Sequence, residues 1–429
     1  MKNPFIAGPP VSGENFYGRK KELDILKNRI QSTIANSLND RYLVLYGRRA
    51  SGKSSILQQL EVINPKDKCL FVKVRVTEAE EYRMFLEDIL NSLFKCLEQT
   101  KSIWEKTFEK FKIFLSGIDG ISYSGISIHW NTEKLGERQV KNTFDDIFPK
   151  LWEQIKQSTS YKALIVAIDE MDNLAGEDAK DFRHKYAFGL KDIGDKWQKS
   201  YQDIFIVVSC LSWIYDELIE LQPSLDRFFE IMQINDFDEN DIDDMFSKIF
   251  TKGIPQKSAS QGYIKEIKKI SGGVPYYIQA ISKEAFELDQ NNILDVDDYK
   301  ASLPKTLKLL DGKIRVSMKN IKVQKHAIRT LRLLSASKRP QVKREDICKD
   351  IEDSFKKSSI YKVNEQYEFH EDEYSGPGQI SNALTSLIHE GLIERVDRGF
   401  YKIIDRMTDL WINYNVGEYS LEESIKRSN

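Results

Sequence analysis

The sequence has few cysteines, no long apolar run and no excess of charge of one sign. Its four cysteines (Cys69, Cys96, Cys210, Cys348) lie far apart without a CxxC pair, which makes a zinc or disulfide framework a poor interpretation and indicates a reducing compartment. No stretch approaches the roughly 18 consecutive apolar residues of a membrane span, and the first residues do not resemble a secretory signal. We therefore expect a cytoplasmic protein with no membrane partner.

The balance of charge argues against a general affinity for nucleic acid. The chain carries 64 basic and 66 acidic residues, a net charge of −2. Binding driven by an overall positive charge is excluded, whereas a local basic patch stays possible. At 429 residues, of which 41% are hydrophobic, the chain is long enough for two or three domains with ordinary cores.

The first half of the chain alternates apolar runs with helical periodicity. Strands separated by helices predict an α/β fold with a parallel sheet covered by helices on both faces. A glycine-rich alternating segment at 117–130 predicts an inserted β-hairpin. The expected strands of the parallel sheet are 41–46, 69–76, 163–168, 204–208 and a shorter one at 230–234.

The second half is predicted to be mostly helical. Helices are expected at 239–251, 261–270 and 275–288, followed by a mixed linker at 289–318. From Val323 onward the pattern is helix, helix, an acidic and aromatic loop at 356–374, helix, two short strands and a final helix with Trp411. That order is typical of a winged helix. The expected domains are 1–235, 236–318 and 319–429, and no internal repeat suggests a solenoid.

A phosphate-binding motif follows the first predicted strand. The segment matches G-x-x-x-x-G-K-[ST] between an apolar run and a helix, as a phosphate loop requires. Glycines allow the backbone amides to point at phosphate oxygens, the lysine adds a positive charge, and the serine hydroxyl ligates Mg²⁺. We therefore expect ATP and Mg²⁺ as cofactors. The predicted binding residues are Gly47, Arg48, Arg49, Ala50, Ser51, Gly52, Lys53, Ser54 and Ser55.

Carboxylates follow the third predicted strand of the sheet. In a phosphate-loop fold the strand beside the loop presents an Asp at its carboxyl end, which predicts Asp169 as a magnesium ligand. Glu170 would orient and deprotonate the attacking water, and Asp172 would be structural or support the ligands. Ser209 ends the next strand and either contacts the γ-phosphate or the water, or simply terminates the strand. Arg227 is either an arginine finger for a neighbouring subunit or a surface ion-pairing residue.

Together these motifs resemble the AAA+ and STAND branches of the P-loop ATPases, and most of all the archaeal-type ATPase family with a C-terminal winged helix. Tyr17, Gly18 and Arg19 lie in a segment similar to the family's adenine contact. Gly272–Tyr276, with Pro275, resembles the GxP motif of the STAND lid. The ending Gly399-Phe400-Tyr401 with Trp411 resembles the family's winged helix. The resemblance spans about 400 residues.

The resemblance implies an ATP-binding, slowly hydrolysing switch. In such a protein, ATP closes the lid and promotes assembly into a homo-oligomer or binding of a protein partner, in defence or transcriptional signalling. The lid lacks the second sensor arginine of many AAA+ proteins, which argues against ring-type hydrolysis. A nucleotide-binding scaffold without useful hydrolysis is a further alternative.

The predicted winged helix leaves the question of DNA open. Its third helix, Gln379–Glu390, contains no Lys or Arg, although basic residues occur nearby at Arg339, Arg344, Arg395 and Arg398. Salt-dependent DNA binding needs several phosphate contacts. One alternative is a DNA binder similar to the origin-recognition ATPases and helicase loaders. The other is a winged helix that contacts protein or folds against the nucleotide domain.

Overall fold

The computed structural model describes residues 2–37, 40–77, 82–98, 121–124, 127–130, 137–174, 179–253, 256–321, 323–337, 339–356, 376–417 and 419–428. The chain divides into two compact units. The first, called the sheet unit below, contains Pro10–Arg48 and Gly52–Asn235. The second, called the helical unit, contains the residues up to Pro9, Arg49–Ser51 and the residues from Asp236 onward. None of the described helices is long and apolar enough to cross a membrane.

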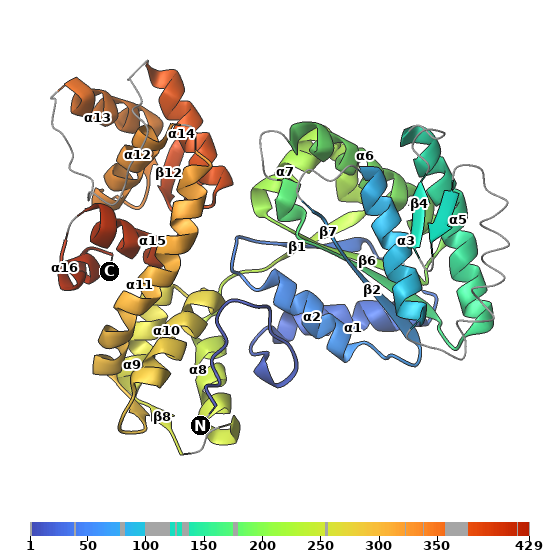
Figure 1. Cartoon of the computed structure of the whole chain (residues 1–429), viewed down its shortest axis with the longest axis horizontal. Helices are drawn as coiled ribbons and strands as arrows, with labels where there is room; N and C mark the ends of the chain where they lie inside the picture. The colour runs from blue at the N-terminus through green and yellow to red at the C-terminus, as the bar shows by residue number, and fades with distance from the viewer. Residues whose placement is uncertain are drawn as a thin grey trace. The chain divides into compact units, whose positions relative to one another are not determined.

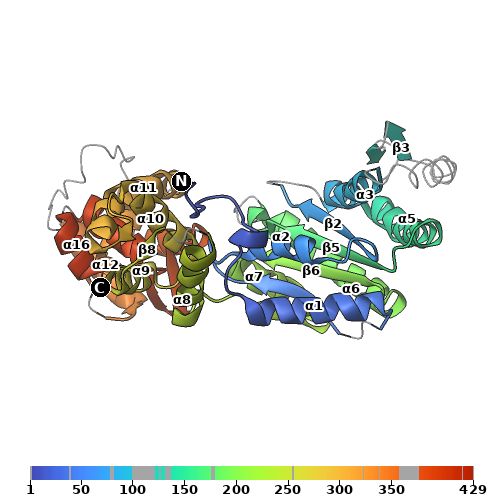
Figure 2. The ribbon, with the colours of Figure 1, turned by 90° about the horizontal axis from the view of Figure 1, so that it is seen from below.

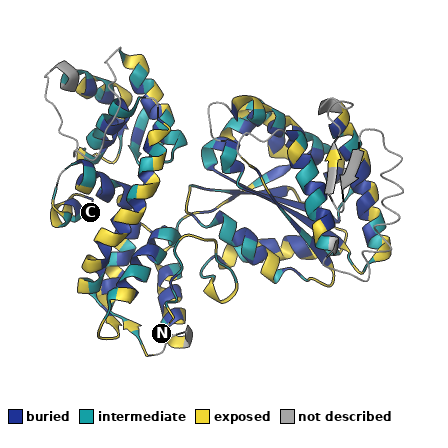
Figure 3. Cartoon of the chain, in the orientation of Figure 1, coloured by how far each residue is buried: buried dark blue, intermediate teal, exposed yellow. Residues whose placement is uncertain are grey.

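The sheet unit is built on five parallel strands, which confirms the predicted α/β fold (Figure 1). Every residue of β5 and β6 is buried, and Figure 3 shows the sheet mostly in the colour of buried residues. Continuous burial explains why these strands have apolar runs rather than alternating patterns. The strands are β1 (Tyr42–Tyr46), β2 (Cys69–Arg75), β5 (Ala163–Asp169), β6 (Ile204–Cys210) and β7 (Phe229–Gln233).

The order of the strands is β2-β5-β6-β1-β7, and Figure 2 shows β2, β5 and β6 side by side. The expectation that the carboxylate strand lies directly beside the loop strand is therefore wrong, because β6 separates β5 from β1. The chain order of strands does not specify their spatial order, since each parallel crossover can pass over a neighbour. As a result, β6 brings Ser209 next to Asp169 at the same edge of the sheet.

Helices cover both faces of this sheet. Helices α1 and α2 lie on one side, and α6 and α7 lie on the other (Figure 1). The helices are α1 (Lys20–Ile34), α2 (Lys53–Ile63), α3 (Tyr82–Glu98), α5 (Glu137–Ser158), α6 (Lys180–Ser200) and α7 (Ser212–Leu221).

The predicted inserted hairpin is present in its described part. Strands β3 (Ile121–Ser124) and β4 (Ser127–Trp130) pair antiparallel as a separate two-stranded sheet. The predicted start of the hairpin, 117–120, lies outside the described residues. The insertion leaves the five-stranded sheet unchanged, because the hairpin adds no strand to it.

The helical unit begins with α8 (Glu239–Lys248), α9 (Gln261–Ser271), α10 (Pro275–Leu288) and α11 (Val296–Lys319). Two short strands, β8 (Ser258–Ala259) and β9 (Ile293–Leu294), form a parallel pair. The start of the chain also belongs here. Phe5 is 2% exposed, and its ring lies 5.9–6.2 Å from the rings of three phenylalanines, namely Phe246, Phe250 and Phe286.

The prediction that residues 289–318 form a linker is wrong, because most of this segment is α11. The helix starts at a capping box in which the Asp295 side chain accepts the backbone N–H groups of Asp297 and Asp298. Pro304 lies inside the helix and, together with the many charged residues, hides the helical pattern. The buried stripe of the helix is Tyr299, Leu303, Leu307, Leu310, Ile314 and Met318.

The last part of the chain, called the last module below, contains five α-helices among the described residues, and a three-stranded antiparallel sheet of order β10-β12-β11. The expected order of elements is found. The predicted loop 356–374 lies outside the described residues except for Lys356, which ends α13. Assignment as a winged helix stays a prediction. The elements are α12 (Gln324–Ala336), β10 (Val342–Lys343), α13 (Arg344–Lys356), α14 (Pro377–His389), β11 (Ile393–Asp397), β12 (Phe400–Ile403), α15 (Arg406–Trp411) and α16 (Leu421–Arg427).

Candidate nucleotide-binding site

The loop between β1 and α2 has the backbone of a phosphate-binding nest. Gly52, the residue before α2, has φ +94°, and Ala50 has φ +65°. Left-handed conformations at these positions turn successive amide groups toward one side. A non-glycine residue such as Ala50 adopts this conformation at a cost of about 1–2 kcal/mol. The backbone at Ala50 is therefore strained in the loop.

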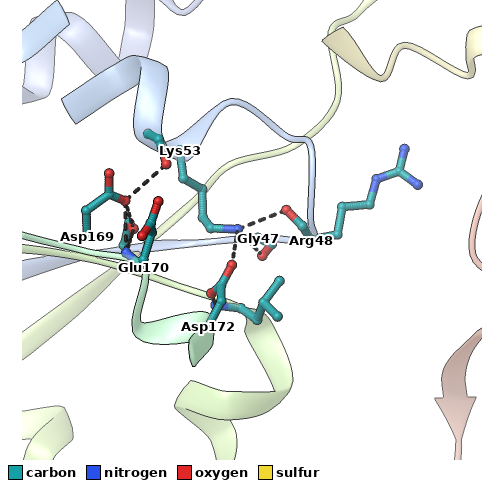
Figure 4. Close-up of polar contacts among 9 residues, drawn as sticks. Gly47, Arg48, Lys53, Asp169, Glu170 and Asp172 are labelled. Carbon is teal, nitrogen blue, oxygen red and sulfur yellow. Dashed lines mark hydrogen bonds and ion pairs between the residues drawn. The ribbon is translucent and has the colours of Figure 1, made fainter. Parts of the chain in front are cut away.

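Lys53 is folded back into this loop. Its side-chain Nζ donates hydrogen bonds of 3.0 Å to the carbonyl oxygens of Gly47 and Arg48, and it lies 3.8 Å from Asp172 Oδ2 (Figure 4). Lys53 is only 6% exposed. An ammonium group held by two neutral carbonyls and one distant carboxylate is suited to exchange these partners for phosphate oxygens.

Asp169, at the end of β5, is the centre of the site. It is 1% exposed, and its Oδ1 accepts hydrogen bonds from Ser54 Oγ at 3.0 Å and Ser209 Oγ at 2.5 Å. Its Oδ2 lies 2.9 Å from Lys73 Nζ. Burial alone would raise the pKa of Asp169, but Ser209, Lys73 and Ser54 together lower it below its usual value. The carboxylate is therefore ionised at neutral pH.

Glu170 has a strained backbone next to this carboxylate. Its φ is +61°, and its N–H donates to Asp169 Oδ1 at 3.0 Å and to Ser209 Oγ at 3.3 Å. Strained residues that the surrounding structure holds in place are frequent at functional sites. Asp172, just beyond, accepts the backbone N–H of Leu211 at 2.7 Å, which ties the end of β5 to the end of β6.

The predicted site residues that have not yet been described lie in three places. Arg19, with φ +63°, is 5% exposed and pairs with Glu22 at 3.2 Å at the start of α1, directly after Tyr17 and Gly18. Arg227 is exposed and precedes β7 at the amino edge of the sheet, opposite the loop. It therefore cannot serve its own phosphate loop. Pro275 is the first residue of α10 in the helical unit.

Lys73 is the site residue that sequence reasoning missed. It lies within β2, between the buried residues Val72 and Val74. A lysine inside an apolar strand is an available signal, because a buried cation needs a partner. The partner could not be identified from the sequence, since Asp169 lies on a strand almost a hundred residues further along the chain.

The oxygen groups at this edge fit a magnesium ion. Mg²⁺ prefers oxygen ligands and commonly keeps several waters while it binds one or two protein groups and the phosphates of the substrate. The Ser54 hydroxyl and the Asp169 carboxylate lie 3.0 Å apart, and both come from the edge of the sheet where the loop lies. These two residues would hold the ion.

A parallel sheet with this loop, followed by a helix and opposed by a buried aspartate, defines the class of P-loop ATPases. A family model described as an ATPase domain predominantly from Archaea matches residues 16–281. This chain belongs to that family.

Solved structures show the same fold. The chain is similar to a Walker-type ATPase of Pyrococcus abyssi, with a TM-score of 0.55 and 15% identity over 96% of this chain and 99% of the other. It is also similar to the ORC2 protein of Aeropyrum pernix in complex with ADPNP and ADP, with a TM-score of 0.51 and 10% identity over 98% and 96%. A search of curated proteins gave no match.

Proposed function

We propose that this ATPase is a molecular switch that binds Mg-ATP at Gly47–Ser55, hydrolyses it slowly and passes its nucleotide state to the helical unit. The observation that carries the proposal is that side chains from α2, β5 and β6 are hydrogen-bonded to one another. The hydroxyls of Ser54 on α2 and Ser209 on β6 both donate to Asp169 on β5. This arrangement connects the phosphate loop to the residue that would activate water.

Each residue of the site has a distinct proposed role. Lys53 exchanges its loop carbonyls for the β- and γ-phosphates, and Ser54 and Asp169 hold Mg²⁺, which would neutralise charge on the phosphates. Glu170 orients and deprotonates the attacking water. Ser209 holds Asp169 and the Glu170 backbone in place.

The remaining predicted contacts are with the adenine end of the nucleotide and with a neighbouring subunit. Tyr17, Gly18 and Arg19 contact the adenine, and Pro275 contacts the nucleotide from the lid, as the resemblance implies. Because Arg227 lies at the opposite edge of the sheet, any action on ATP requires a second copy of the chain. This role fits assembly into a homo-oligomer.

Contacts within the helical unit support the transmission of the nucleotide state. Two residues after Pro275, Tyr277 donates from its hydroxyl to Asp405 Oδ2 at 3.1 Å. Arg406 Nη1 donates to the carbonyl of Lys269 at 2.7 Å. Helices α9 and α10 are thereby joined to α15 of the last module. A movement of the Pro275 turn would consequently carry this module with it.

A protein partner for the last module is favoured over DNA, which is the alternative. If the module is a winged helix, its reading helix is α14, whose Ser381 Oγ is already bonded by Arg344 Nη2 at 2.6 Å. Arg339 pairs with Asp346 at 3.0 Å and Lys402 with Glu394 at 2.6 Å. Basic side chains that are paired within the protein offer fewer phosphate contacts.

Calorimetric titration with Mg-ATP tests the proposal. Wild type is expected to release or absorb heat in a saturable way, whereas Lys53→Glu is expected to lose binding. Glu170→Gln is expected to bind ATP normally and to release phosphate at least about 100-fold more slowly, the size typical of losing a general base. The absence of heat with wild type would refute nucleotide binding, and unchanged phosphate release in Glu170→Gln would refute the role of this residue.

Two further measurements test the switch and its partner. Light scattering of Glu170→Gln with and without ATP is expected to show an ATP-dependent increase in mass. Equal mass in both conditions would refute nucleotide-driven assembly. Gel-shift titration with duplex DNA at low and physiological salt is expected to show only weak binding; nanomolar, salt-sensitive binding would instead favour the DNA-binding alternative.

A further inference from the structure

Lys73 occupies an unusual place in the sheet. It lies in β2, which pairs in parallel register with β5 so that Lys73 is opposite Ala167 and Arg75 is opposite Asp169. Its Nζ reaches the end of the neighbouring strand and lies 2.9 Å from Asp169 Oδ2. The side chain of Lys73 is 22% exposed and that of Asp169 is 1% exposed. The ion pair therefore has a partly buried lysine and a fully buried carboxylate.

The two oxygens of Asp169 have different partners. Oδ1 accepts the hydroxyls of Ser54 and Ser209 and the N–H of Glu170, all of which are neutral donors. Oδ2 faces the ammonium group of Lys73. The other lysine of the site, Lys53, lies instead near Asp172, at 3.8 Å. Lys73 thus compensates a buried charge that neutral donors alone would leave unbalanced.

We propose that Lys73 is an internal counter-ion of Asp169, which makes the site accept magnesium together with nucleotide and reject magnesium alone. This inference rests on the proposed function. A divalent cation that approaches Asp169 without nucleotide meets the positive charge of Lys73 a few ångströms away. The phosphates of ATP bring enough negative charge to offset that repulsion. Lys73 is in this sense a positioning and specificity-determining residue.

A second consequence concerns the nucleotide-free protein. Removing one partner of a buried ion pair strongly destabilises a protein, because the remaining charge has no compensation. Without Lys73, a divalent cation bound to Asp169 would supply the missing charge. The nucleotide-free variant should therefore gain a dependence on Mg²⁺ that the wild-type protein does not have.

Thermal unfolding of the nucleotide-free full chain against MgCl₂, at constant ionic strength, tests the proposal. Lys73→Met is expected to unfold at a lower temperature than wild type, and Mg²⁺ is expected to raise that temperature in a saturable way. Its apparent affinity for Mg²⁺ should be at least about tenfold higher than that of wild type, as loss of a nearby unit charge implies. Lys73→Arg, which keeps the charge, is expected to respond to Mg²⁺ as wild type does.

Lys156→Met is the matched control. Lys156 Nζ lies 2.5 Å from Asp203 Oδ2, and the Asp203 side chain is 6% exposed, so the variant also removes a lysine from a buried carboxylate. Asp203 directly precedes β6 and lies at the amino edge of the sheet, away from the phosphate loop. Lys156→Met should lose stability without any specific recovery in Mg²⁺.

Two outcomes would overturn the inference. One is an equal response to Mg²⁺ in wild type and Lys73→Met, whether both respond or neither does. The other is a response in Lys73→Met that persists when Asp169→Asn is added. If Lys73→Met does not fold, Lys73→Gln takes its place under the same criteria. Because these titrations contain no nucleotide, their failure is distinct from a failure of wild type to bind Mg-ATP.

Discussion

Substituting Ser209 by alanine removes one hydroxyl from the middle of the site. In the structure this hydroxyl donates to Asp169 Oδ1 at 2.5 Å and accepts the N–H of Glu170 at 3.3 Å. Ser209 is 2% exposed, so water cannot easily replace it. The geometry predicts that Ser209 acts through Asp169 and Glu170 and not by direct contact with the nucleotide.

The size of the effect follows from the charge of the acceptor. A hydrogen bond to an ionised group contributes about 1.5–3 kcal/mol, so Ser209→Ala should lower the free energy of unfolding by about that amount. If the same positioning is needed in the transition state, turnover falls by about 10- to 150-fold. ATP affinity should change by less than about threefold, because the loop and Lys53 remain.

Loss of this donor also changes the dependence on pH. The folded-state pKa of Asp169 is below its usual value, so its contribution to stability is present above the unfolded pKa of about 3.9 and is lost as pH falls through the folded pKa. Without Ser209 the folded pKa rises toward the unfolded one. The difference in stability between wild type and Ser209→Ala should therefore shrink below about pH 4.

Three assays check this prediction together: urea unfolding, phosphate release for turnover, and calorimetry for ATP affinity. Thr33→Val is the control, because Thr33 is fully buried and its hydroxyl donates to the Arg29 carbonyl at 2.6 Å in α1, remote from the carboxylates. It should affect stability and leave turnover unchanged. The reasoning fails if Ser209→Ala weakens ATP binding as much as it slows turnover while its stability stays at the wild-type value.

Three further predictions concern the helical unit, each measured by urea unfolding. Gly273→Ala should lower the free energy of unfolding by about 2–5 kcal/mol, because Gly273 has φ +83° and an added Cβ would lie 2.3 Å from the Phe237 carbonyl oxygen. Gly272→Ala, with open space around the added Cβ, should lower it by only about 1–2 kcal/mol. Equal losses of stability in the two variants would contradict this prediction. Phe5→Ala should lower stability by about 3–5 kcal/mol, whereas a loss below about 1 kcal/mol would mean that the start of the chain is not anchored. Asp409→Asn should raise the free energy of unfolding at pH 7 and not near pH 4. Burial raises the pKa of Asp409, so its ionisation in the folded protein costs stability as pH rises above the unfolded pKa. A gain in stability that does not depend on pH would exclude this cause.

The sequence was sufficient for the features that depend on local pattern. Buried parallel strands have continuous apolar runs, which made β5 and β6 visible in advance. The phosphate loop combines fixed glycines with Lys53 and Ser54 because the backbone must turn tightly around a phosphate. Asp169 was predictable since it ends an apolar strand. The phosphate loop and Asp169 could therefore be predicted without knowing which strand lies between β1 and β5.

Other features depended on tertiary structure. The insertion of β6 between β1 and β5, which brings Ser209 to Asp169, follows from crossovers whose span the sequence does not reveal. Helix α11 forms despite Pro304, because its apolar stripe is buried and the helix packs against α9 and α10. The pairing of Lys73 with Asp169 required the register of β2 against β5. A buried charge selects its partner by distance in space, and that distance exists only after the sheet has formed.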